Sequence, residues 1–160
     1  IRDLEQYKGI GSAKAITILA ACELGKRRQK ATAEEAPILN SAENIYQFMH
    51  TTIQDLDIEE GWVLMMKQNF RLIEAKRISV GGLTMAPVDL RLMMKEVLLK
   101  NTTVLAFCHN HPSGSTNPSR DDDILTSHIH KACELLHIHF ADHVILTDGG
   151  YFSYREEGKL

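Results

Sequence analysis

The segment from Val104 to Asp122 constrains the fold more than any other part of this 160-residue chain. Its apolar start, Val104 to Phe107, is typical of a buried strand, and the polar residues 109–117 that follow are typical of a loop. Pro118 and Ser119 then predict the first turn of a long helix. A strand, a loop and a returning helix in this order indicate a sheet that is covered by helices.

The remaining patterns extend this arrangement in both directions. They predict helices at 3–28, from Ser41 onward, at 87–100 and at 118–136, and strands at 62–66, 70–73, 78–80, 138–140, 144–146 and 151–154. The stretch 29–37 has no apolar period and predicts a linker. We therefore expect an N-terminal helical segment within 1–36, followed by a mixed α/β domain over 37–160.

Composition excludes several classes of protein. The net charge of −3 and the pI near 6.2 argue against a chain that binds nucleic acid over its whole surface. The three cysteines are widely spaced and form neither a disulfide framework nor a CxxC pair, which fits a reducing compartment. The sequence has no run of 18 or more apolar residues and no secretory signal pattern. These features predict a soluble cytoplasmic protein without a membrane contact.

His109, His111 and Asp122 are candidate ligands of one metal ion. Side chains two apart at the end of a strand point to the same side, so the two imidazoles can share a cation. Asp122 lies in the first turn of the following helix and can supply a third donor. Two imidazoles and one carboxylate leave a tetrahedral zinc ion one open position, which is the layout of a catalytic site. Taken alone, a His-x-His pair is usually incidental, and Ser119 to Asp122 also fits a helix capping box, but their conjunction favours a metal site.

A zinc hydrolase also needs a general base and a donor for the developing oxyanion. Glu59 and Glu60 both stand just before the strand that begins at Trp62, and the residues alone leave the choice between them open. Ser119, which precedes Asp122 at the start of the helix, is the candidate hydroxyl donor.

The motif His109-Asn110-His111-Pro112, with Ser119 and Asp122 following at the spacing of Ser-x-x-Asp, resembles that of the JAMM (MPN, JAB) metalloprotease superfamily and looks like its RadC branch. The resemblance implies a cytidine-deaminase-like fold, a curved mixed sheet flanked by helices. It implies Zn²⁺ held by His109, His111 and Asp122, with Glu59 as the base and Ser119 as the oxyanion donor. It also implies hydrolysis of a peptide or isopeptide bond, and it leaves the substrate and the oligomeric state undefined.

The alternative is a DNA-associated module with a structural or vestigial metal. The Gly9-Ile10-Gly11 turn followed by Lys14 looks like the second half of a helix-hairpin-helix, which RadC chains carry before the MPN domain, and such a turn can make a weak contact to a DNA phosphate. A two-metal nuclease is disfavoured, because the acidic run 121–123 is consecutive in one helix and cannot converge on paired ions.

The other reactive side chains are predicted to be structural. His128 and His130 diverge on a helix, and His137 and His139 have no carboxylate at metal spacing. His143 is expected to orient Asp142 or to pack in the core. Strand alternation points Cys108 away from the two histidines, which predicts a buried apolar role.

Overall fold

The computed structural model describes residues 2–81 and 88–160, which fall into two compact units, Ile1–Ala36 and Pro37–Leu160. The first unit contains a short helix α1 (Arg2–Glu5) and a long helix α2 (Ser12–Glu35). The turn between them passes through Gly9, which has a positive φ of 91°. The Lys14 ammonium donates a hydrogen bond of 2.9 Å to the Gly9 carbonyl, so one of its donors is used within the turn.

The linker predicted at 29–37 is wrong, because α2 continues to Glu35. Residues 29–35 lack an apolar period, but Gln, Lys, Ala and Glu in this stretch are all good helix formers. Gly25, which we expected near the helix end, lies inside α2. The helix ends where Pro37 disfavours the helical conformation of the residue before it, and Ala36 is extended at φ −63° and ψ 134°.

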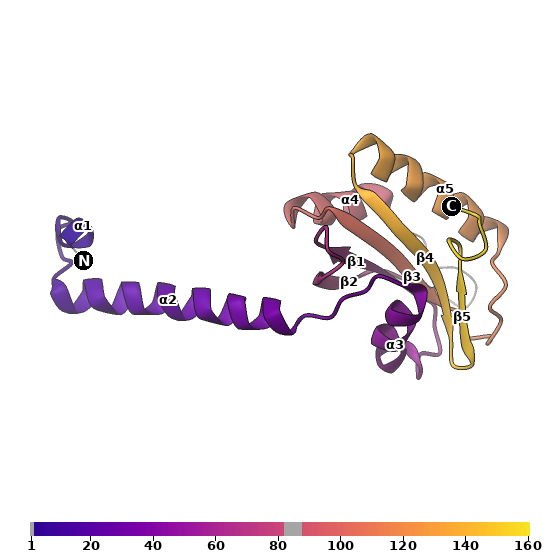
Figure 1. The fold of residues 1–160 in the computed structure, drawn as a ribbon, viewed down its shortest axis with the longest axis horizontal. Helices are drawn as coiled ribbons and strands as arrows, with labels where there is room; N and C mark the ends of the chain where they lie inside the picture. The colour runs from indigo at the N-terminus through magenta and orange to yellow at the C-terminus, as the bar shows by residue number, and fades with distance from the viewer. Residues whose placement is uncertain (1, 82–87) are drawn as a thin grey trace. The chain divides into compact units, whose positions relative to one another are not determined.

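The second unit is a mixed α/β domain, as predicted (Figure 1). Its elements follow the chain in this order: α3 (Ala42–Ile53), β1 (Glu60–Met66), β2 (Leu72–Val80), α4 (Leu90–Leu99), β3 (Val104–Asn110), α5 (Arg120–Leu135), β4 (His139–Thr147) and β5 (Gly150–Ser153). The five strands form one sheet in the order β2-β1-β3-β4-β5. Among the strands of the described residues, only β3 and β4 pair in parallel, and α5 connects them. In the part of the chain that the structure describes, no helix has the length and apolar character to span a membrane.

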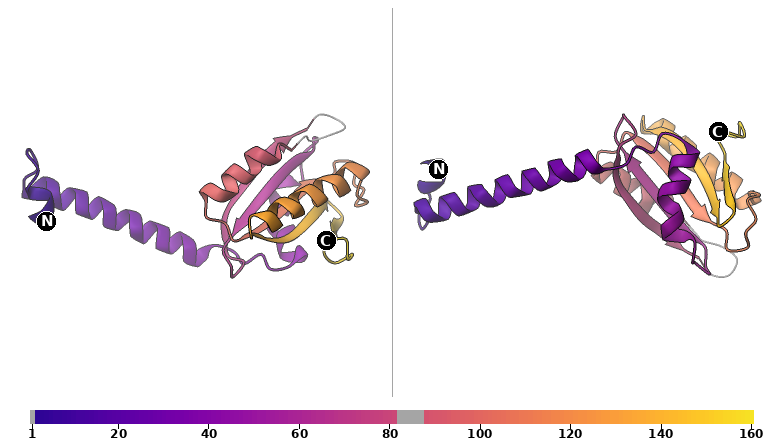
Figure 2. Two further views of the ribbon diagram at one scale, coloured as in Figure 1. Left: turned by 90° about the horizontal axis from the view of Figure 1, so that it is seen from above. Right: turned by 60° about the horizontal axis from the view of Figure 1, so that its bottom comes forward.

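Helices cover both faces of the sheet and give the domain two apolar cores (Figures 1 and 2). On one face α3 buries Ile45 and Met49 against strand residues such as Leu64. On the other face α4 and α5 bury residues such as Val97 and Ile129 against Phe107 and its neighbours. Because both faces of the sheet are covered, the central strands β1 and β3 carry buried apolar residues on both sides.

Two pairs of predicted strands are in fact single strands. The strands expected at 70–73 and 78–80 merge into β2, and those at 138–140 and 144–146 merge into β4. Polar residues interrupt the apolar pattern in both cases, but backbone pairing continues through them because partners satisfy the side chains. In β2, Lys76 pairs with Glu96 at 2.6 Å, and in β4, Asp142 accepts hydrogen bonds from Ser153 and Arg155. Residues 82–87, which include the start of the helix predicted at 87–100, lie outside the described residues, and α4 is described from Leu90.

The crossover from β3 through α5 to β4 positions the candidate site. β3 runs through His109 to Asn110, three residues further than the apolar run predicts. The loop 111–118 then leads to α5, which begins with Ser119 as its N-cap and lies on the face of β3 that carries His109. The first turn of α5 therefore faces the last residues of β3.

Candidate metal centre

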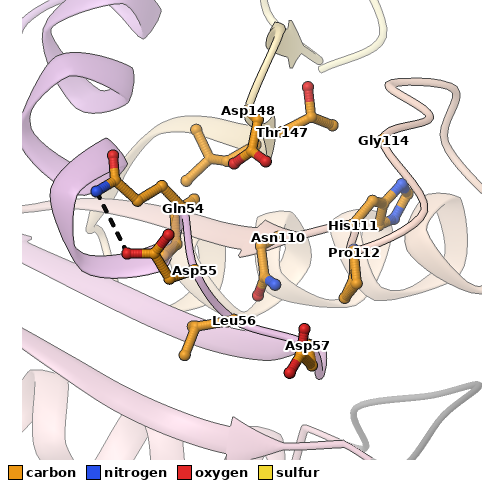
Figure 3. A pocket seen from close by; sticks show the side chains of 12 residues that line it. Gln54, Asp55, Leu56, Asp57, Asn110, His111, Pro112, Gly114, Thr147 and Asp148 are labelled. Atoms are coloured by element: carbon orange, nitrogen blue, oxygen red, sulfur yellow. Dashed lines mark hydrogen bonds between the residues drawn. The ribbon is translucent and has the colours of Figure 1, made fainter.

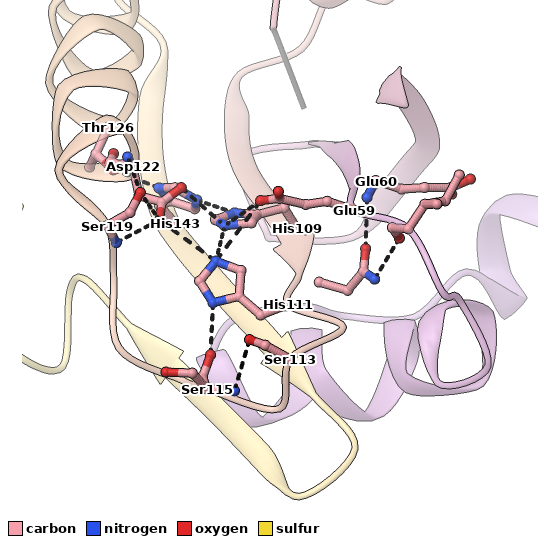
Figure 4. Close-up of polar contacts among 12 residues, drawn as sticks. Glu59, Glu60, His109, His111, Ser113, Ser115, Ser119, Asp122, Thr126 and His143 are labelled. Atoms are coloured by element: carbon pink, nitrogen blue, oxygen red, sulfur yellow. Dashed lines mark hydrogen bonds and ion pairs between the residues drawn. The ribbon is translucent and has the colours of Figure 1, made fainter. Parts of the chain in front are cut away.

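Four potential metal donors converge where β3 ends: Glu59, His109, His111 and Asp122 (Figure 4). The Nε2 atoms of His109 and His111 are 3.0 Å apart, and Asp122 Oδ1 lies 3.1 Å from His109 Nε2. Asp122 Oδ2 lies 3.7 Å from His111 Nε2. Glu59 Oε1 is further away from both rings, at 3.5 Å and 3.9 Å. The spacing of His109, His111 and Asp122 in the sequence predicted that these three group together, and the family resemblance implied Glu59 beside them.

These separations fit the donor set of a tetrahedral ion. Ligand bonds of about 2.0–2.2 Å to zinc place neighbouring donors roughly 3.3–3.6 Å apart. The two imidazoles and Asp122 span 3.0 to 3.7 Å, so small shifts would give each of them a bond to one ion. Nitrogen and carboxylate oxygen together are donors that zinc prefers. Glu59 is the outermost of the four, where a carboxylate can face the remaining position.

The two histidines are oriented by different means. His109 is 3% exposed, and its Nδ1 contacts His143 Nε2 at 2.9 Å. His111 follows the strand, and its backbone N–H donates to the Leu146 carbonyl at 3.0 Å. Its ring Nδ1 lies 2.7 Å from the Ser115 carbonyl, which can only accept, so Nδ1 carries the proton and Nε2 is free to bind a cation.

Asp122 takes part in both the capping box and the donor group. The Ser119 hydroxyl accepts from the Asp122 backbone N–H at 3.2 Å, and the Ser119 N–H donates to Asp122 Oδ2 at 2.8 Å. The two sequence interpretations of this tetrapeptide are therefore compatible. The Ser119 hydroxyl also donates to Asp122 Oδ2 at 2.7 Å, so its proton is directed at the ligand in this state.

Asn110 holds the segment that carries Glu59. This buried side chain donates to the Ile58 carbonyl at 2.9 Å and accepts from the Glu60 N–H at 2.8 Å. Glu60 points away from the donors, because its carboxylate pairs with Arg77 at 2.6 Å and accepts from Trp62 Nε1. Glu59 is thus the carboxylate that faces the histidines. Sequence reasoning left the role of Asn110 unrecognised, and only its place between the two histidines could have suggested it.

His143 contacts the donor group through His109. Its ring lies between His109 and Thr126 and is completely buried, and burial holds its pKa well below the usual value. The Asp142 carboxylate accepts hydrogen bonds from Ser153 and from the Arg155 N–H. Of the two roles expected for His143, packing in the core is the one that its buried ring fills, against Phe107 and Tyr154.

The charges of the site favour cation binding. Burial opposes ionisation of Asp122, but its close contacts with His109 and His111 and the hydrogen bonds from Ser119 outweigh that effect and hold its pKa well below the usual range. The contact with Asp122 raises the pKa of His111 despite partial burial. Asp122 is therefore an anionic donor near neutral pH.

The other histidines and Cys108 lie apart from this group. His128, His130, His137 and His139 are all exposed. Cys108 is fully buried in the core on the α3 side, and burial raises the pKa of its thiol far above the usual value. Both observations agree with the predicted structural roles.

A cavity of about 480 Å³ adjoins the candidate metal centre at His111 (Figure 3). Its walls come from the end of α3, the loop that follows it, the loop after β3 and the end of β4. Asp55, Asp57 and Asp148 line it together with Asn110. The cavity provides room for a ligand beside the donors.

The fold and the donor group define a mixed α/β domain with a candidate site for a single metal ion. Residues 39–159 match the family model described as RadC-like JAB domain, and the chain belongs to this family. It is similar to the UPF0758 protein of Flavobacterium johnsoniae, with 38% identity over 99% of this chain and 69% of the relative. UPF0758 proteins of Porphyromonas gingivalis (35%, covering 96% and 68%) and Rubrobacter xylanophilus (36%, covering 100% and 70%) are further relatives.

Proposed function

We propose that the chain is a zinc-dependent hydrolase of the JAMM type that cleaves a peptide or isopeptide bond. The observation that carries the proposal is the convergence of two imidazole Nε2 atoms and the Asp122 carboxylate within 3.0 to 3.7 Å, with Glu59 next outward. Membership of the RadC-like JAB family supports it. A zinc ion held by His109, His111 and Asp122 would supply Lewis acidity and activate water as a nucleophile near neutral pH.

The protein groups around the donors can perform the proton transfers. Glu59 lies beside the open side of the donor group, where its carboxylate can take a proton from the attacking water and deliver it to the leaving nitrogen. Ser119 can donate to the oxygen of the scissile carbonyl when its hydroxyl rotates away from Asp122. The Ser119 backbone N–H continues to hold Asp122 Oδ2 during that rotation. We propose that the substrate chain occupies the cavity beside His111.

The metal proposal is tested by elemental analysis of the purified chain. We expect about one zinc ion per chain in the native protein, and almost none when His109→Ala and His111→Ala are combined, because two of three ligands are lost. His128→Ala with His130→Ala is the matched control, since this second His-x-His pair is exposed on α5. Equal zinc in the native chain and the His109/His111 variant would contradict the proposal.

The role of Glu59 is tested with Glu59→Gln. We expect full zinc content and a turnover lowered by about 10²- to 10⁴-fold, because general acid–base catalysis is lost while the three ligands remain. The assay screens peptide, isopeptide and DNA substrates with and without a chelator. Glu60→Gln is the control, with its melting temperature recorded because Glu60 pairs with Arg77. If Glu59→Gln also loses zinc, Glu59 is a ligand; if it keeps full turnover, the base is another group.

A further inference from the structure

A chain of short hydrogen bonds runs behind His109, on the side away from the candidate metal position (Figure 4). The Thr126 hydroxyl contacts the Asp122 carbonyl at 2.6 Å and His143 Nδ1 at 2.5 Å. His143 Nε2 in turn contacts His109 Nδ1 at 2.9 Å. All three side chains are at most 3% exposed, so water does not compete for these bonds. The chain connects α5, β4 and β3 in one network.

The directions of the first two bonds in this chain follow from its first member, the Asp122 carbonyl. The Asp122 carbonyl can only accept, so the single Thr126 proton is directed at it. Toward His143 the Thr126 oxygen must therefore accept, which places a proton on His143 Nδ1.

The second half of the chain depends on His143 being neutral. Its ring is 0% exposed, and no carboxylate lies within ion-pair distance of it among residues 2–81 and 88–160. Asp122 attracts a charged imidazolium there, but complete burial outweighs that attraction, so the charged form is costly. His143 Nε2 is consequently bare and accepts from His109 Nδ1–H. His109 Nε2 is then left with its lone pair directed at the donor group.

We propose that Thr126 and His143 are positioning residues that fix His109 in the tautomer that binds zinc through Nε2, an inference that rests on the proposed function. His111 reaches the same tautomer through the Ser115 carbonyl. Two bare Nε2 atoms 3.0 Å apart repel each other unless a cation or a proton lies between them, so the network prepares the site for a cation.

Packing holds the central ring of this network in place. Tyr154 stacks on His143, with centroids 4.8 Å apart and planes 6° apart, and the Phe107 ring contacts it edge-on. The Tyr154 hydroxyl donates to Asp123 at 2.9 Å, which ties the stack to the first turn of α5. The same turn carries Asp122. The start of α5 therefore positions one candidate ligand, Asp122, directly and a second, His109, through Tyr154 and His143.

The decisive variant is Thr126→Val, which has nearly the same shape but lacks the hydroxyl. We expect it to weaken zinc binding about 10- to 100-fold in a chelator competition, as loss of an outer partner of a ligating histidine typically does. Thr126→Ser keeps the hydroxyl and should bind zinc like the native chain. Thr102→Val is the matched control, because Thr102 is also buried and its hydroxyl has no partner within the described residues.

A second readout does not depend on zinc. Nitrogen NMR of the metal-free chain should show His109 protonated at Nδ1 in the native protein and in Thr126→Ser, and a mixture of tautomers in Thr126→Val. The pair His143→Gln and His143→Leu tests the next position. The Gln side-chain oxygen can accept from His109 Nδ1 and should restore much of the zinc affinity, whereas Leu should not.

The outcomes separate the two proposals. Unchanged zinc affinity and an unchanged His109 tautomer in folded Thr126→Val would overturn the positioning role while leaving the hydrolase proposal intact. If the native chain binds no zinc, the proposed function fails, and the tautomer measurement alone then decides the positioning role. A lower melting temperature in Thr126→Val with native zinc affinity would indicate a structural role only and also overturn the inference.

Discussion

Gly61 in β1 lies where the sheet has no space for a side chain. A Cβ atom added there would collide with Ser79 Oγ and approach Phe107 Cζ at 2.9 Å. Gly61 pairs with His109 in the neighbouring strand, and Phe107 packs against the rings of His109 and His143. The bare backbone at this position lets Phe107 fill the space below the candidate metal centre.

We therefore expect Gly61→Ala to lower the free energy of unfolding by about 1–3 kcal/mol, because Phe107 cannot move far in a closely packed core. Urea unfolding measures the change. Gly149→Ala is the control, since a Cβ there meets nothing within 4 Å. An unfolding free energy for Gly61→Ala equal to that of the native chain would show that Ser79 and Phe107 give way easily.

At the residue scale, the sequence predicted the donors but not their supports. His109, His111 and Asp122 could be found because a strand end and a helix start bring them together over a short distance in the chain. The contacts of His143 with His109 and Thr126 depend on the parallel register of β3 and β4, which local patterns do not determine. The antiparallel register of β1 and β3 likewise decides that Asn110 reaches the segment before β1.

At the scale of elements, the type of each element was easier to predict than its ends. Apolar periodicity located the helices and the central strands, because it reflects the face that each element buries. It failed in β2 and β4, where partners satisfy polar side chains within a continuous strand. It also failed for 29–35, where helix propensity acts without an apolar face.

A substitution at Gly25 tests whether α2 ends near this residue, as the sequence predicts, or continues to Glu35, as in the structure. Inside a helix, Gly25→Ala should raise the stability of α2 by up to about 1 kcal/mol, because glycine is a poor helix former. Far-ultraviolet circular dichroism during heating measures helix content. Gly9→Ala should act in the opposite direction, since Gly9 has a φ of 91°. A loss of helix content in Gly25→Ala would instead support the prediction of a shorter helix that ends near Gly25 and the basic residues after it.

At the scale of the whole domain, the candidate ligands connect distant parts of the chain. His109 and His111 lie at the end of β3, Asp122 lies in α5, and Glu59 precedes β1. Because the unfolded chain does not hold these groups together, a bound ion should stabilise the folded state.

Zinc should accordingly raise the melting temperature of the unit Pro37–Leu160, and a chelator should lower it. Free zinc at 100 times the dissociation constant corresponds to about 2.7 kcal/mol of added stability. Fluorescence of Trp62, the single tryptophan of the chain, reports the unfolding of this unit. The combined His109→Ala and His111→Ala variant should have the same melting temperature with zinc and with chelator. If zinc raised the melting temperature of this variant as much as that of the native chain, the ion would bind at another site.

The alternation of β1 has a consequence for how this protein can change through mutation. Glu60 lies on the side of β1 that packs with Leu64 against α3, and Glu59 comes one residue earlier, facing His109. Leu64 and Val63 pack in the two separate cores, so selection that keeps them there also keeps the register of β1. The same register keeps Glu59, and not Glu60, facing the donors. A one-residue slip of β1 would exchange the two acids and would also place Leu64 and Val63 in each other's core. Such a lineage would disrupt the packing of both cores before it could use the other acid.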